Sequence, residues 1–120
     1  MESQVEAVRD AAVAALEDAK ARDIKVMDVR ALTDVTEYMI IATGTSGRHV
    51  RSIADKLIEA MKKAGHRPLG SEGVDQGEWV LIDLNEAIVH VMQADVRAFY
   101  DLETLWSDEL RRLIESNRES

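Results

Sequence analysis

The sequence predicts a single mixed α/β domain, in which helices flank a mixed β-sheet and the elements follow the order α-β-β-α-β-β-α. In three segments apolar residues recur every three or four positions, which is the period of a helix with one apolar face. Four short apolar runs between them have the length and composition of strands. Two of these runs are separated by only two residues, which predicts a hairpin and therefore a sheet with antiparallel pairs.

The first part of the chain is expected to contain one helix and two strands. Residues 3–20 show the helical period. Residues 24–29 alternate in polarity, which is typical of a half-buried strand. Residues 38–43 form an almost continuous apolar run, which is typical of a strand covered on both faces. We expect this second strand to lie at the centre of the sheet.

The next helix has the most regular pattern in the sequence. It follows Ser46, a good N-cap residue, and is expected to end at Gly65, where a left-handed C-cap conformation is needed. Residues 66–77 hold the one proline of the chain and three of its six glycines, so they are expected to form a loop. Residues 79–84 and 87–92 are expected to pair as a hairpin.

A helical period returns at Asp95, and an N-cap signal at Ser107 is expected to break this helix. We therefore expect one domain over residues 1–120, in which residues 108–120 form a C-terminal helical extension. The apolar stripe is wider than one packed face requires. The residues expected to bury the helix are Val96, Phe99, Trp106, Leu110 and Leu113. The residues that widen the stripe are Tyr100, Leu102 and Leu105.

The composition is that of a soluble globular protein. Hydrophobic residues make up 46% of the 120 residues and charged residues 32%. No apolar run approaches the roughly 18 residues that a membrane-spanning helix needs. The absence of cysteine excludes disulfides and thiolate metal sites, and the N-terminal segment lacks a secretory or transit pattern. We therefore expect a cytoplasmic protein with no membrane contact.

The formal net charge of −8 argues against binding nucleic acid over the whole surface and favours basic partners. The charge is unevenly distributed, since residues 44–70 contain six Lys and Arg against two Asp and Glu. The predicted helix over residues 46–64 is therefore basic. Its charges form either a solvated face or a patch that contacts RNA. The first interpretation is favoured because no aromatic residues are interleaved to stack on bases.

The turn before this helix has the layout of a phosphate-binding site, because helix N-terminal amides attract anions. Its residues are Gly44, Thr45, Ser46, Gly47 and Arg48. It is neither a P-loop nor a GxGxxG motif. The acids Asp83 and Glu86 are three positions apart, so one strand face cannot present both to a metal ion. A helix cap with a glycine bend is the favoured interpretation, and a nucleotide-binding or nucleotidyltransferase-like module with a vestigial anion turn is the alternative.

Other catalytic or metal-binding patterns are lacking. No two of the three histidines have the i, i+4 spacing of a helical zinc site. His90 lies in an apolar strand, which favours a core or interface histidine with a hydrogen-bonded ring over a metal ligand or a catalytic base. No serine or cysteine nucleophile has a recognisable motif. We therefore expect a protein that is not an enzyme and has no metal and no cofactor.

Large apolar residues on the polar side of a strand indicate an interface. Strict alternation places Trp79 and Leu81 on the same face as Asp83. Together with the wide stripe of the C-terminal helix, they form more apolar surface than one soluble domain needs. Either this surface binds a partner, or the strand and the helix pack against each other.

Several blocks of the sequence resemble the ribosomal silencing factor family, also called Iojap-related proteins. The blocks are Asp23-Ile24, TGTSGRHV from Thr43 with the following SIADKL, Glu72-Gly73, WVLID from Trp79, VHVM from Val89 and RAFYDLETLW from Arg97. They extend from about residue 5 to 107 in the order of the family. The departures are mild: Glu37 stands where many members carry Asp, and Asn85 replaces a common turn glycine.

The resemblance implies a bacterial repressor of translation. Such a factor binds the free large ribosomal subunit through ribosomal protein number fourteen and blocks association with the small subunit when nutrients are scarce. The resemblance also implies a homodimer when free and a fold similar to the nucleotidyltransferase core without its catalytic carboxylates. Limited contact with rRNA is expected only on the RNA-facing interpretation of the basic helix. Carried over by position, the contact residues are Trp79, Leu81, Arg97, Tyr100, Leu102 and Leu105.

Overall fold

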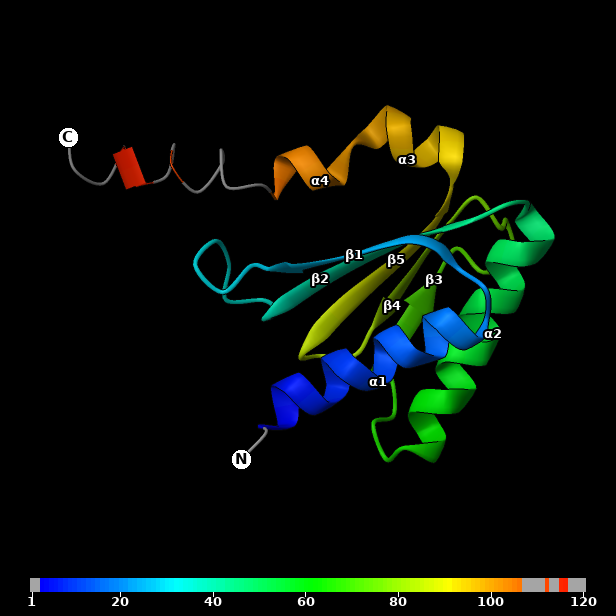
Figure 1. Cartoon of the computed structure of the whole chain (residues 1–120), viewed down its shortest axis with the longest axis horizontal. Helices are drawn as coiled ribbons and strands as arrows, with labels where there is room; N and C mark the ends of the chain where they lie inside the picture. The colour runs from blue at the N-terminus through cyan, green and yellow to red at the C-terminus, as the bar shows by residue number, and fades with distance from the viewer. Residues whose placement is uncertain (1–2, 107–111, 113–114, 117–120) are drawn as a thin grey trace.

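The computed structural model describes residues 3–106, 112 and 115–116. A five-stranded sheet separates two helical layers, with α1 and α2 on one face and α3 and α4 on the other (Figure 1). In chain order the elements are α1 Gln4–Asp18, β1 Arg22–Asp28, β2 Tyr38–Gly44, α2 Gly47–Lys63, β3 Gly70–Glu72, β4 Trp79–Asp83, β5 Ala87–Gln93, α3 Ala94–Tyr100 and α4 Leu102–Leu105. The predicted α/β fold class and its order of main elements are confirmed.

The strands lie in the order β1-β2-β5-β4-β3. Strands β2 and β5 are parallel, and the other three neighbouring pairs are antiparallel, so the predicted mixed sheet and the β4–β5 hairpin are confirmed. The prediction that β2 is central is wrong. Strand β5 takes the middle position because it pairs with its hairpin partner on one side and with β2 on the other. All seven residues of β2 are nevertheless buried, as its continuous apolar run predicts.

The expected loop over residues 66–77 contains a strand that the sequence did not predict. Strand β3 pairs antiparallel with β4, from Gly70 opposite Asp83 to Glu72 opposite Leu81. Its three residues, Gly, Ser and Glu, are all exposed. A short edge strand of this composition has no apolar period, so β3 depends on backbone pairing with β4 rather than on burial.

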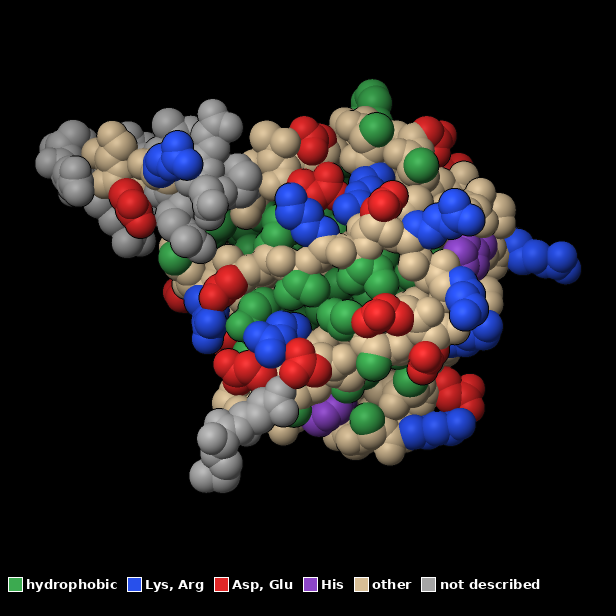
Figure 2. Space-filling model, viewed as in Figure 1, with side chains coloured by type: hydrophobic (Ala, Val, Ile, Leu, Met, Phe, Trp, Pro, Cys, Tyr) green, Lys and Arg blue, Asp and Glu red, His purple; other side chains and the backbone are tan. Residues whose placement is uncertain are grey.

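Two hydrophobic clusters lie on opposite faces of the sheet. The larger cluster joins α1 and α2 to one face of β2, β4 and β5. The smaller cluster is formed by Met27, Val29, Met39, Ile41 and Met92. Half-buried side chains of α3 and α4, among them Val96 and Leu102, pack against it. Figure 2 shows hydrophobic side chains gathered across the middle of the molecule, between α1 and the α3–α4 layer, with charged side chains around them.

The ends of α2 are formed by residues that the sequence singles out. The Ser46 side chain accepts a hydrogen bond from the His49 amide at 3.1 Å, which confirms the predicted N-cap. At the other end Gly65 adopts a φ of +84°, and the His66 amide donates to the carbonyl of Met61 at 2.8 Å. This is the Schellman arrangement that a glycine at the end of a helix predicts.

The C-terminal helix is broken earlier than predicted. Helix α3 ends at Asp101, which has a φ of +49°, and α4 begins at the next residue. After this left-handed residue, Leu102 and Trp106 pack on the smaller cluster. The break expected at Ser107 lies outside the described residues, as do Leu110, Leu113 and most of the predicted extension over residues 108–120.

Candidate protein-docking surface

Three aromatic side chains form a contiguous surface where α3 meets the start of β4. The ring centroids of Trp79 and Tyr100 lie 4.7 Å apart with an interplanar angle of 50°. The rings of Phe99 and Tyr100 meet edge to face at 5.1 Å. These are the separations at which aromatic rings attract one another. We call this set of three residues the aromatic surface.

A shallow hollow of about 470 Å³ lies within the aromatic surface. Its apolar walls come from Trp79, Val96, Phe99 and Tyr100, and its acidic rim comes from Glu78 and Asp95. An apolar hollow with a charged rim is typical of the pockets that receive an anchoring side chain at a protein interface.

The prediction that Phe99 is buried is wrong. Its side chain is 81% exposed, whereas Tyr100 and Leu105 are each 53% exposed. Helix α3 has only seven residues, so its inner face has room for Val96 and Arg97 and leaves Phe99 on the outer side. A phenylalanine this exposed is a functional candidate that the helical period alone assigned to the core.

The remaining predicted contact residues are partly covered. Leu81 is half-buried on β4 and lies opposite His90 of β5. It shares the sheet face of Trp79, because the other face carries the fully buried Val80 and Ile82, as the alternation predicts. Leu102 is half-buried against the smaller cluster, so much of its side chain serves the packing of α4.

His90 lies under Trp79. It is 5% exposed, and its Nδ1 accepts a hydrogen bond from Trp79 Nε1 at 2.9 Å. The prediction of a core histidine with a hydrogen-bonded ring is confirmed. Burial lowers the pKa of His90 to about 4, because the imidazolium form loses its hydration.

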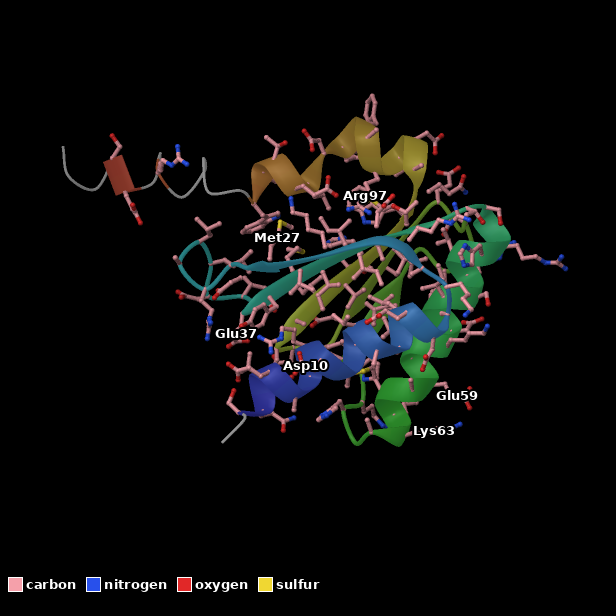
Figure 3. All side chains as sticks on the ribbon, in the orientation of Figure 1. Asp10, Met27, Glu37, Glu59, Lys63 and Arg97 are labelled. Carbon is pink, nitrogen blue, oxygen red and sulfur yellow. The ribbon has the colours of Figure 1, made fainter. Side chains whose placement is uncertain are left out.

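Arg97 uses its guanidinium group to join α3 to the rest of the molecule. Its Nε pairs with Glu103 of α4 at 2.5 Å, and its Nη1 donates to the Asp23 carbonyl and to Thr43 Oγ1, each at 2.7 Å. Its side chain is 14% exposed. Figure 3 shows Arg97 and Met27 between the sheet and the α3–α4 layer. In this geometry Arg97 holds α3 and α4 on the sheet more than it presents a charge to solvent.

Two backbone amides at the glycine turn before α2 donate to side chains of the same segment. The Thr45 amide donates to His49 Nδ1 at 2.9 Å, and the His49 amide donates to Ser46. The opposite ring nitrogen of His49 contacts the Ala19 carbonyl at 3.2 Å. These bonds satisfy part of the helix N-terminus from within the chain. The geometry therefore supports the helix-cap interpretation over nucleotide binding.

Gly44 of this turn and Gly77 of the neighbouring loop are each required by close packing. A Cβ on Gly44 would lie 2.7 Å from Val50 Cγ2, so the close contact of β2 with α2 requires glycine. A Cβ on Gly77 would lie 2.7 Å from the Gly47 carbonyl oxygen, because the loop before β4 packs on the turn. Arg48, the last residue of the predicted turn, lies in the first turn of α2 and is exposed.

In the described part of the chain, no group of three or more His, Asp or Glu side chains is arranged to hold a metal ion. None of the helices among residues 3–106 is long and apolar enough to cross a membrane. The basic helix α2 lies on the opposite face of the sheet from α3 (Figure 1), so contact with RNA stays a separate prediction.

Comparison with known proteins gives this geometry a context. The family model described as "Ribosomal silencing factor during starvation" matches residues 2–120. The chain belongs to the ribosomal silencing factor family. The resemblance seen in the sequence blocks is thereby confirmed.

Individual relatives support the membership in this family. A ribosomal silencing factor from Haemophilus influenzae is 48% identical over 92 residues, which cover 77% of this chain and 90% of the relative. A crystal structure of a protein from Chromobacterium violaceum superimposes with a TM-score of 0.85 at 42% identity, covering 87% of each chain. The mouse protein named "Mitochondrial assembly of ribosomal large subunit protein 1" is 33% identical over 101 residues, which cover 82% of this chain and 44% of the relative.

Within this silencing factor, five of the six predicted contact residues fall into two groups, and the sixth, Leu81, is half-buried on β4. Trp79, Tyr100 and Leu105 present side-chain surface to solvent. Arg97 and Leu102 mainly hold α3 and α4 on the sheet. Phe99 joins the first group, although the helical period of the sequence predicts it to be buried. The signal that identifies it is its place next to Tyr100 at the end of a short helix.

Proposed function

We propose that this chain binds the free large ribosomal subunit through ribosomal protein number fourteen and sterically blocks association with the small subunit. The observation that carries this proposal is the aromatic surface of Trp79, Phe99 and Tyr100 in a member of the silencing factor family. The result of binding is lower translation when nutrients are limited. The family description supports the link to starvation, and the printed name of the mouse relative refers to the large ribosomal subunit.

The aromatic surface has the properties of an interface centre. Tryptophan and tyrosine are enriched among the residues that dominate binding energy, and they work best within a packed group that excludes water. Tyr100 contacts rings on two sides and still exposes half of its side chain. Removal of such a residue typically costs at least about 2 kcal/mol, which is roughly 30-fold in affinity.

Charge favours a basic protein partner. The chain carries a formal net charge of −8, and Glu78 and Asp95 form the rim of the hollow. Ribosomal proteins that contact rRNA are basic, so attraction increases the rate of association, while repulsion from rRNA phosphate disfavours binding elsewhere. Association should therefore weaken as salt concentration rises.

Silencing by occlusion requires no chemistry. A bound factor that covers the docking area of the small subunit inhibits joining in proportion to its occupancy, which follows mass action. The affinity for the free large subunit and the residence time on it then decide how strongly translation falls.

Co-sedimentation with isolated ribosomal subunits tests the proposal. We expect the wild-type chain to sediment with large subunits and not with small ones, and to inhibit their association in light scattering. Tyr100→Ala should lose binding while its circular dichroism spectrum stays unchanged. Leu69→Ala is the matched control, because Leu69 is an apolar residue that is 70% exposed. Its backbone amide donates to the Asp83 carbonyl, so it lies at the opposite end of β4 from Trp79. Equal binding by both variants would contradict the assignment of the surface.

We also propose that the free chain is a cytoplasmic homodimer. An exposed phenylalanine beside an exposed tyrosine supports self-association, since such surface is usually covered in solution. Light scattering after gel filtration should give twice the 13.4 kDa chain mass, and Phe99→Ser should shift it toward one chain mass. A monomer at all concentrations would rule out the dimer without affecting the ribosome proposal.

A further inference from the structure

The indole N–H of Trp79 is already used inside the molecule. Trp79 Nε1 donates to His90 Nδ1 at 2.9 Å, and the two rings lie 5.8 Å apart at an angle of 51°. His90 comes from the neighbouring strand β5 and is almost fully buried. A partner that docks on Trp79 therefore meets the ring and not a free donor.

This hydrogen bond requires a neutral histidine in one tautomer. A ring nitrogen that accepts a hydrogen bond carries no proton, so the proton must be on His90 Nε2. Burial lowers the pKa of His90 to about 4, which keeps the ring neutral near pH 7. The acceptor is therefore available near pH 7.

The bond also constrains the orientation of a half-exposed ring. Trp79 is the first residue of β4 and is only partly covered. Its ring contacts are with His90 and Tyr100. Without an acceptor at His90, a half-buried indole N–H would lose a partner and would gain by turning toward water. That turn would also remove the ring from its contact with Tyr100.

We propose that His90 is a positioning residue of the docking surface, because its Nδ1 fixes the orientation of the Trp79 ring that the partner contacts. The inference rests on the proposed binding to the large subunit. It assigns no contact between His90 and the partner. It predicts that the partner recognises Trp79 through apolar and ring-face contacts, since the N–H group is occupied.

Two substitutions separate the acceptor from the volume of the side chain. In His90→Asn the amide oxygen stands near the position of Nδ1 and can accept the bond, whereas His90→Leu fills a similar volume without an acceptor. The indole N–H signals of the chain are recorded by nitrogen-15 NMR, with Trp79→Phe to assign the signal of Trp79 against that of Trp106. Binding to large subunits is measured for the same proteins by co-sedimentation.

We expect a shifted and faster-exchanging Trp79 indole signal in His90→Leu, together with roughly ten-fold weaker binding, which is the value of one lost hydrogen bond. His90→Asn should recover most of both. Unchanged signal and affinity in His90→Leu would overturn the inference, and so would equal losses in the two variants. If His90→Leu fails to fold, rapid exchange of the Trp79 indole N–H in the wild-type protein would overturn it. If the wild type does not bind large subunits, the proposed function fails. The indole signal then still shows whether His90 orients the Trp79 ring.

Discussion

Replacing Arg97 by alanine should release α3 and α4 from the sheet without unfolding the larger core. The substitution removes the ion pair with Glu103 and leaves the Asp23 carbonyl and the buried Thr43 hydroxyl without their donor. Each hydrogen bond to a charged group contributes about 1.5–3 kcal/mol, and bonds within one network are not additive. Since the Arg97 side chain is 14% exposed and that of Glu103 is 22% exposed, solvent screening is limited. We expect the opening free energy of this layer to fall by about 2–4 kcal/mol.

Hydrogen exchange followed by mass spectrometry measures this opening directly. A loss of about 2–4 kcal/mol corresponds to amide exchange in residues 94–105 that is roughly 30- to 1000-fold faster. Amides of β2 and α2 should change far less, because the larger cluster does not include Arg97. Lys63→Ala is the control, since its pair with Glu59 joins side chains that are 77% and 71% exposed at the outer end of α2 (Figure 3). Exchange in α3 that is no faster in Arg97→Ala than in Lys63→Ala would refute the reasoning.

Three further predictions concern stability. Gly44→Ala should destabilise the fold by about 1–3 kcal/mol in urea titrations, because the added methyl group meets Val50 at 2.7 Å. The folded state depresses the pKa of His90 from 6.5 to about 4, so its contribution to stability is complete above pH 6.5 and is lost as the pH falls toward 4. Thermal melts should show that the free energy of unfolding falls by about 2 kcal/mol between pH 7 and pH 5. In His90→Asn the free energy of unfolding should vary less over the same pH range, because asparagine does not titrate. Asn85 has a φ of +72°, so Asn85→Ala should cost about 1 kcal/mol in urea titrations while Asn85→Gly should cost nothing.

The sequence predicts the main elements where burial is periodic. The continuous apolar run of β2 and the stripe of α2 each specify one structure, and Ser46 and Gly65 specify the ends of α2. Strand β3 was missed because its pairing uses backbone groups and its side chains are exposed. The central position of β5 was missed because strand order depends on pairing between distant segments.

The candidate site was predicted in composition but not in the role of each residue. Aromatic and aliphatic residues in unusual places indicated a surface, and that signal included Trp79 and Tyr100. Helix α3, which leaves Phe99 exposed, ends at a left-handed Asp101, and no glycine at that position indicates the break in the sequence. The internal partners of Arg97 depend on an irregularity of β1 near Asp23, whose carbonyl accepts its hydrogen bond. Neither the left-handed Asp101 nor the irregularity of β1 produces a periodic pattern in the sequence.

The aromatic surface, together with His90 and Arg97, comes from one continuous stretch of chain, residues 78–106, whereas both hydrophobic clusters also draw on residues from the first half of the chain. On the proposed function, the residues that determine partner preference are therefore encoded in one segment of the gene. A chimera in which residues 78–106 of one relative replace those of another should also take over the first relative's preference for its own ribosome. The chimera must also keep hydrogen-bond acceptors at positions 23 and 43, because Arg97 joins the exchanged segment to the rest of the domain through these two acceptors.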